Sequence, residues 1–140
     1  GLASARALAE VGRPVALWDL DVEVSQKAAD EIASEFGVAT LGEGFDVSQS
    51  GFYGAAIERA REKLASLGGL VHCAGVAHPV PVDHLDEENW DAVLDVNLRA
   101  HIRAARLLVP HWRSIGSGYF VSVASAAARN WCRCWSARSR

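Results

Sequence analysis

The chain has 140 residues, of which half are hydrophobic and 22% are charged, as is typical of one globular domain. Its formal net charge of −3 gives no electrostatic basis for binding nucleic acid or an anionic membrane surface, and no apolar run approaches the roughly 20 residues of a membrane span. The three cysteines lack the spacing of a disulfide framework and the five histidines lack the spacing of metal ligands, so we expect a cytoplasmic protein without a metal site.

Helical and extended patterns alternate along the chain from its first residues. Leu2, Ala5, Leu8 and Ala9 recur at helical spacing, which predicts a helix over 2–11 that ends at Gly12. The following segments are predicted as a strand at 14–20, a helix at 22–37, a short strand within 38–49 that two glycines interrupt, a helix at 54–68, a strand at 69–75, a loop at 77–86, a long helix at 87–112 and a strand at 118–125.

Two of the predicted helices carry further signals. In the helix at 22–37, Val22, Ala28, Ile32 and Phe36 are expected to mark the buried face. Asp86 stands directly before the helix at 87–112, where its carboxylate can cap the first turn. The alternation of helices with short apolar strands predicts an α/β fold, a doubly wound, Rossmann-like parallel sheet covered by helices on both faces.

Polar or small residues follow each predicted strand at its carboxyl end, which is where doubly wound folds bind ligands. These residues are Asp19, Asp46 with Val47, the segment "HCAG" at 72–75, and Ser125. An acidic side chain at Asp19 can accept both ribose hydroxyls of an adenosine and would repel a 2′-phosphate, which favours NAD over NADP. The alternative is a solvated aspartate that begins a turn.

The other candidate residues each allow a structural and a functional interpretation. Gly1 precedes a helix whose free N–H groups could hold a pyrophosphate, and Cys73, Ala74 and Gly75 could let a ligand lie against the backbone or simply form a turn. Asn97 is a poor helix former within a helix, and is either a satisfied core polar group or the holder of a water molecule in a proton path. Ser125 is either a hydrogen-bond donor to a substrate oxygen or a turn residue.

Taken together, these segments resemble the short-chain dehydrogenase/reductase family. "ALAEVGRPVALWDLD" is similar to part of the family's first βαβ unit, "FDVSQ" to its adenine-contacting Asp-Val, and "GLVHCAGV" to its "LVNNAGV" segment. "NWDAVLDVNLRA" resembles the family's helix with a central asparagine, and "GYFVSVASAAA" resembles its serine-bearing strand. The resemblance covers residues 1 to about 128, in matching order and spacing.

The resemblance implies a role for each candidate residue in hydride exchange between a nicotinamide and a carbonyl or alcohol carbon. Asp19 would bind the adenosine ribose, Asp46 and Val47 the adenine, and Gly1 the pyrophosphate. Cys73, Ala74 and Gly75 would line the cofactor. Asn97 would hold a water molecule of the proton relay, and Ser125 would steady the substrate carbonyl. The implied partners are NAD, a small carbonyl or alcohol substrate, and a second copy of the chain that docks on the helix at 87–112.

The chain also departs from the family pattern. His72 and Cys73 replace an asparagine pair, and no tyrosine is followed by a lysine four residues on, although the family uses such a pair as its catalytic acid. The family's first strand and most of its glycine-rich turn would precede Gly1, so we expect a partial Rossmann domain over 1–128 with a gap between the strands at 14–20 and 69–75. We expect the chain to be inactive by itself. Residues 129–140, which lose all periodicity, are predicted to be an unstructured tail read in a shifted frame.

Two other functions remain open from the sequence. The first is a non-catalytic module that binds a nucleotide or oligomerises. The second is a methyltransferase that uses S-adenosylmethionine, since such enzymes also place an acidic residue after the second strand. The "HCAG" and "VNL" segments argue against the methyltransferase.

Overall fold

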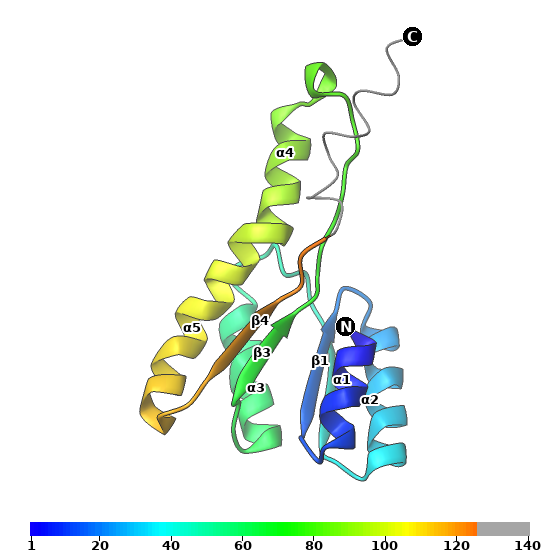
Figure 1. The fold of residues 1–140 in the computed structure, drawn as a ribbon, viewed down its shortest axis with the longest axis vertical. Helices are drawn as coiled ribbons and strands as arrows, with labels where there is room; N and C mark the ends of the chain where they lie inside the picture. The colour runs from blue at the N-terminus through cyan, green and yellow to red at the C-terminus, as the bar shows by residue number, and fades with distance from the viewer. Residues whose placement is uncertain (126–140) are drawn as a thin grey trace.

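The computed structural model describes residues 1–125, which alternate between helices and short parallel strands as predicted (Figure 1). The elements are α1 (Leu2–Glu10), β1 (Val15–Asp19), α2 (Val22–Phe36), β2 (Thr40–Gly44), α3 (Tyr53–Leu64), β3 (Gly69–His72), the 3₁₀ turn η1 (Val82–His84), α4 (Glu87–Leu94), the π-helical turn η2 (Asp95–Arg99), α5 (Ala100–Ile115) and β4 (Tyr119–Ser122). No helix of this described part is long and apolar enough to cross a membrane.

The four strands form two separate parallel pairs. β1 pairs with β2 in a register that runs from Val15 opposite Thr40 to Asp19 opposite Gly44. β3 pairs with β4, with Gly69 opposite Tyr119 and His72 opposite Ser122. β1 and β3 are not hydrogen-bonded to each other. The sheet is therefore divided between β1 and β3, which is where the sequence predicted a gap.

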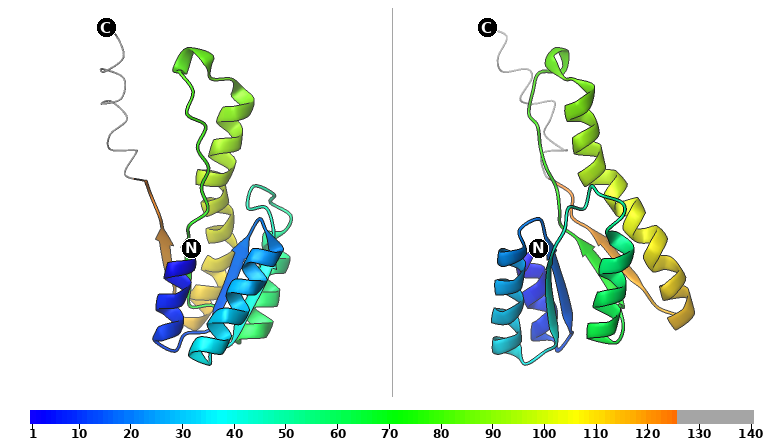
Figure 2. Two further views of the ribbon diagram at one scale, coloured as in Figure 1. Left: turned by 90° about the vertical axis from the view of Figure 1, so that its right-hand side faces the viewer. Right: turned by 180° about the vertical axis from the view of Figure 1, so that it is seen from behind.

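Helices cover both faces of the strand pairs, and α3 connects them. In Figure 1 α1 crosses in front of β1 while α3 lies behind the strands, and the rear view in Figure 2 reverses that order. Tyr53 and Ala56 of α3 pack in one cluster with Phe45 and with residues of α5, against which Trp18 of β1 and Leu70 of β3 also pack. This cluster joins the two strand pairs through side chains.

The two glycines of β2 have a packing role that the strand pattern does not show. A Cβ atom at Gly42 would lie 2.4 Å from the Ser25 carbonyl oxygen of α2, and one at Gly44 would lie 2.7 Å from the Cβ of Val22. The absence of side chains lets α2 lie directly on the strand. The helix consequently buries Ser25, Ala29 and Ile32, and the prediction that Val22 marks the buried face is wrong, because Val22 is 46% exposed.

Several predicted boundaries also change. α3 ends at Leu64, where Ala65 adopts a left-handed backbone with φ 63°, instead of continuing to 68. The strands β3 and β4 stop at His72 and Ser122, short of the predicted 75 and 125. The long helix extends past 112 to Ile115, and Gly116 ends it with a φ of 70°. Asp86 caps α4 as predicted, since its carboxylate accepts the Asn89 N–H at 2.7 Å.

Candidate functional site

Most of the predicted site residues lie at the carboxyl-end edge of the strand pairs. Asp19 is the last residue of β1, and Asp46 follows the end of β2. Cys73, Ala74 and Gly75 follow β3 directly. Because all four strands are parallel, these ends face the same side of the molecule, and the N-terminus lies beside them in Figure 1.

Asp19 is placed where a ribose could reach it. Its side chain is exposed, and its Oδ1 accepts the Asp21 N–H at 3.2 Å. Asp21 in turn caps α2 by accepting the N–H groups of Glu23 and Val24. These short local bonds fix the turn after β1, so the Asp19 carboxylate is held at the strand end and remains accessible to hydroxyl donors.

Asp46 and Val47 form a tight turn after β2. The Asp46 carboxylate accepts the Ser48 N–H at 2.8 Å, and Val47 packs against the cluster that contains Phe45 and Tyr53. The Ser48 carbonyl accepts a hydrogen bond from Arg103, a residue of α5 that is 55 positions away in the sequence. The turn is thus held by one hydrogen bond within it and by another from α5.

Gly1 and the segment after β3 lie against each other across the division of the sheet. A Cβ atom at Gly1 would lie 3.8 Å from the Cβ of Cys73, and one at Gly75 would lie 3.5 Å from the Asn97 Oδ1. Gly1 is also the N-cap residue of α1 and offers no side-chain cap. The first backbone N–H groups of α1 therefore begin beside the end of β3, where a helix N-terminus favours an anion.

Asn97 lies in the π-helical turn η2 and binds the segment after β3 through both groups of its amide. Its Oδ1 accepts the Val76 N–H and its Nδ2 donates to the Val76 carbonyl, each at 2.8 Å. The side chain is thus satisfied, as one of the two interpretations expected, but it is exposed and not in a core. A π turn within a helix is frequently found at functional sites.

The sequence did not predict the histidine pair beside this edge. The rings of His72 on β3 and His101 on α5 are stacked, with centroids 3.7 Å apart and an interplanar angle of 22°. His101 Nε2 is 2.8 Å from the Ser122 Oγ of β4, while both ring nitrogens of His72 are buried without a hydrogen-bond partner. Burial, and then the neighbouring His101, lower the pKa of His72 to about 4, so His72 is neutral at physiological pH. No spacing in the sequence relates His72 to His101, which lie 29 positions apart.

Ser125 does not end β4, as was predicted, but lies three residues beyond it. β4 stops at Ser122, although the Val123 N–H still donates to the His72 carbonyl at 3.0 Å. The predicted domain boundary near 128 and the tail at 129–140, with Cys132 and Cys134, lie outside the described residues. Within residues 1–125, no group of three or more His, Cys, Asp or Glu side chains is arranged to hold a metal ion.

A family model described as "short chain dehydrogenase" matches residues 1–139 of the chain. Among curated proteins, 2-(S)-hydroxypropyl-CoM dehydrogenase 3 of Xanthobacter autotrophicus is 33% identical over 127 residues, which are 91% of this chain and 49% of that protein. The chain therefore spans about half the length of this relative.

Solved structures also match nearly all of this chain and about half of their own length. L-sorbose reductase of Gluconobacter frateurii, complexed with NADPH and L-sorbose, matches with a TM-score of 0.84 and 28% identity, over 93% of this chain and 50% of that one. NADPH-dependent 3-quinuclidinone reductase of Rhodotorula rubra matches with a TM-score of 0.81 and 30% identity, over 92% and 49% of the two chains.

Proposed function

Because the chain belongs to the short-chain dehydrogenase family, we propose that it forms the dinucleotide-binding part of an oxidoreductase that acts on a small alcohol or carbonyl compound. The observation that carries this proposal is the set of groups at one edge of the sheet. The Asp19 carboxylate, the turn at 46–48 and the contact of Gly1 with Cys73 come from both strand pairs and face the same side.

An adenine dinucleotide would contact these residues through its separate parts. Asp19 would accept the ribose hydroxyls, Asp46 and Val47 would contact the adenine, and the N–H groups that follow Gly1 would hold the pyrophosphate. Cys73, Ala74 and Gly75 would line the remainder of the cofactor. The nicotinamide, when bound, supplies or accepts the hydride.

We further propose NAD as the preferred cofactor, since the exposed Asp19 carboxylate would repel a 2′-phosphate. The two solved relatives described above use NADPH, which argues the other way. Titration of the chain with NADH and with NADPH decides between them: we expect tighter binding of NADH, and tighter binding of NADPH would reject this assignment of Asp19.

Asn97 and Ser125 are proposed for the catalytic end of the site. Asn97 would hold the water molecule of a proton relay, since its bonds to Val76 use one of its two amide N–H groups and one lone pair of its oxygen. Ser125 would donate to the substrate oxygen. The 140 residues contain no tyrosine followed by lysine four positions on, so we propose that they do not turn over substrate by themselves.

The outer face of α4 and α5 is proposed as the surface where two copies associate. Trp90, Leu98 and Ile102 of these helices and the η2 turn between them are each more than half exposed, and exposed apolar side chains of this kind could pack against a second copy. A purely oligomerising, non-catalytic module is the second candidate function, and it predicts soluble oligomers that do not bind NADH.

Calorimetric titration with NADH tests the leading proposal. We expect binding by the wild-type chain and a loss of about a hundredfold in affinity for Asp19→Ala, because two hydroxyl bonds to a charged group are removed. Asp30→Ala, which removes an exposed carboxylate from the middle of α2, is the matched control and should bind as the wild type does. Equal effects of the two variants, or binding of S-adenosylmethionine in preference to NADH, would contradict the proposal.

A further inference from the structure

Arg103 connects two parts of the site that are far apart in the sequence. Its Nη1 donates to the Ser48 carbonyl at the end of the turn after β2, and its Nη2 donates to the Asp95 Oδ1 at 3.1 Å. The Arg103 side chain is 28% exposed and that of Asp95 30%, so this pair is better shielded from water than an ordinary surface ion pair. The planar guanidinium can hold two acceptors at a fixed separation, which a lysine cannot do.

Each acceptor of Arg103 belongs to a turn that further local bonds hold. Ser48 belongs to the turn that the Asp46 carboxylate closes, and the adjoining Val47 packs on the cluster around Tyr53. Burial raises the pKa of Tyr53 to about 12, while the charge of Arg103 lowers it and that of Asp46 raises it.

Asp95 is the first residue of the π-helical turn that contains Asn97. It also pairs with Arg99, the last residue of that turn, at 3.3 Å, and Asp95 accepts the backbone N–H of Ala100. The position of Asp95 therefore sets the position of η2, whose Asn97 holds both backbone groups of Val76. Hydrogen bonds therefore link the turn at 46–48 to Asp95 and link Asn97 to the segment after β3, and the backbone of η2 joins Asp95 to Asn97.

We propose that Arg103 is a positioning residue that couples the turn at 46–48 to the Asn97–Val76 pair, so that occupation of the adenine end of the site orders its catalytic end. This inference rests on the proposed function for the identity of the two ends, but the coupling itself is a property of the ligand-free chain. Because an energetic coupling is reciprocal, loosening either end should loosen the other.

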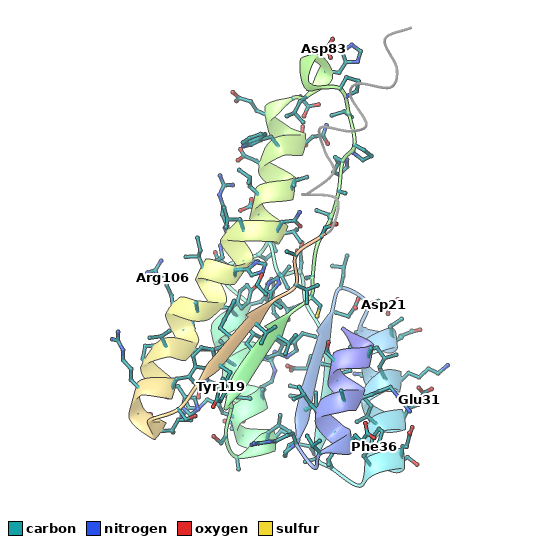
Figure 3. The ribbon with its side chains drawn as sticks, in the orientation of Figure 1. Asp21, Glu31, Phe36, Asp83, Arg106 and Tyr119 are labelled. Carbon is teal, nitrogen blue, oxygen red and sulfur yellow. The ribbon has the colours of Figure 1, made fainter. Side chains whose placement is uncertain are left out.

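Hydrogen exchange of the ligand-free 140-residue chain tests the coupling directly. In Arg103→Gln, we expect the amides of Ser48 and Val76 both to exchange about tenfold faster, while those of α2 keep the wild-type rate. Arg106→Gln is the matched control, since Arg106 is on the same helix and points away from the strands in Figure 3, and it should change neither rate. Faster exchange at Ser48 alone, or the same change in Arg106→Gln, would overturn the proposal.

A titration with 5′-AMP followed by NMR supplies a readout that a merely stabilising residue would not alter. In the wild type, AMP should shift the Val47 amide and the Asn97 side-chain amide together. In Arg103→Gln the Val47 shift should persist and the Asn97 shift should fall by more than about half, and persistence of both would refute the coupling. If AMP shifts nothing in the wild type, the proposed function fails, and the exchange experiment still decides the coupling.

A second variant, Arg103→Lys, tests the coupling if Arg103→Gln loses hydrogen-exchange protection throughout the chain. Lysine retains the charge, but its compact ammonium lacks the rigid planar fork that presents two N–H groups at a fixed separation. We expect Arg103→Lys to retain wild-type exchange in α2 and to lose the joint response of Ser48 and Val76. Wild-type coupling in Arg103→Lys would show that the bridge is not needed.

Discussion

The His72 side chain is a buried titratable group beside the proposed site. It is 6% exposed, it stacks on His101, and its pKa of about 4 lies below the ordinary value of 6.5. Between these two values the unfolded chain binds a proton at this position that the folded chain does not bind. The contribution to stability is therefore complete above pH 6.5 and is lost as the pH falls toward 4.

We predict that the free energy of unfolding falls by up to about 3 kcal/mol from this one residue as the pH is lowered from 7 to 4. In His72→Asn, which places the family's usual residue at this position, that part of the pH dependence should disappear. Urea denaturation of both proteins at a series of pH values measures the difference. A parallel pH dependence of the two proteins would show that His72 does not titrate as we expect.

The structure also explains why position 42 is a glycine. A Cβ atom there would overlap the Ser25 carbonyl oxygen, whereas nothing lies within 4 Å of a Cβ atom at Gly54 in α3. We predict that Gly42→Ala destabilises the chain by about 1–3 kcal/mol through overpacking, while Gly54→Ala stabilises it by about 0.5–1 kcal/mol through helix propensity. Chemical denaturation of both variants measures these changes, with Gly54→Ala as the control. A Gly42→Ala variant as stable as the wild type would contradict the packing of α2 on β2.

At the scale of the elements, the start of α4 is fixed by one side chain. Asp86 accepts the backbone N–H and the side-chain amide of Asn89, each at 2.7 Å. Asp86→Ala should cost about 1 kcal/mol and should speed hydrogen exchange in the first turn of α4. Asp83→Ala, which removes an exposed carboxylate from the preceding turn, should have no such effect. Similar exchange in both variants would mean that the cap does not stabilise α4.

The order and type of the elements could be predicted from the sequence because they depend on local patterns. Helical spacing, the glycines after α1 and α2, and the capping position of Asp86 each act within a few residues, and each prediction is confirmed. The buried face of α2 could be predicted only in part: Ile32 is buried as expected, but Val22 is exposed, and Ser25 and Ala29 are buried instead. It depends on how closely the helix approaches Gly42, which is a contact between two elements and leaves no periodic signal in either.

The candidate site, too, could be predicted only in part. The positions of Asp19, Asp46 and Cys73 at strand ends follow from the alternation of elements, which the sequence displays. The stack of His72 on His101 and the bridge by Arg103 join residues 29 and 55 positions apart, respectively, and pairing across such distances cannot be read from one sequence. The π turn at Asn97 was likewise hidden, since one extra residue in a helical turn does not interrupt the apolar pattern.

At the scale of the whole molecule, the divided sheet should govern how the chain unfolds. No strand pair of the described part crosses the division, and the two halves are joined by α3 and its side-chain cluster. We predict that the half containing α2 and the half containing α5 lose hydrogen-exchange protection at different urea concentrations. Mass spectrometry of peptides from each helix measures this, and a single shared midpoint would contradict it.

The central claim is that one ligand binds across both halves at the carboxyl ends of the strands. The most direct measurement is the NMR chemical-shift map of the 140-residue chain on titration with NADH. The account predicts that the amides of Asp19 and Val47 in one half and of Ala74 and Gly75 in the other shift together with one dissociation constant, and that S-adenosylmethionine produces no such pattern. Shifts confined to one half, or an equal response to S-adenosylmethionine, would contradict it.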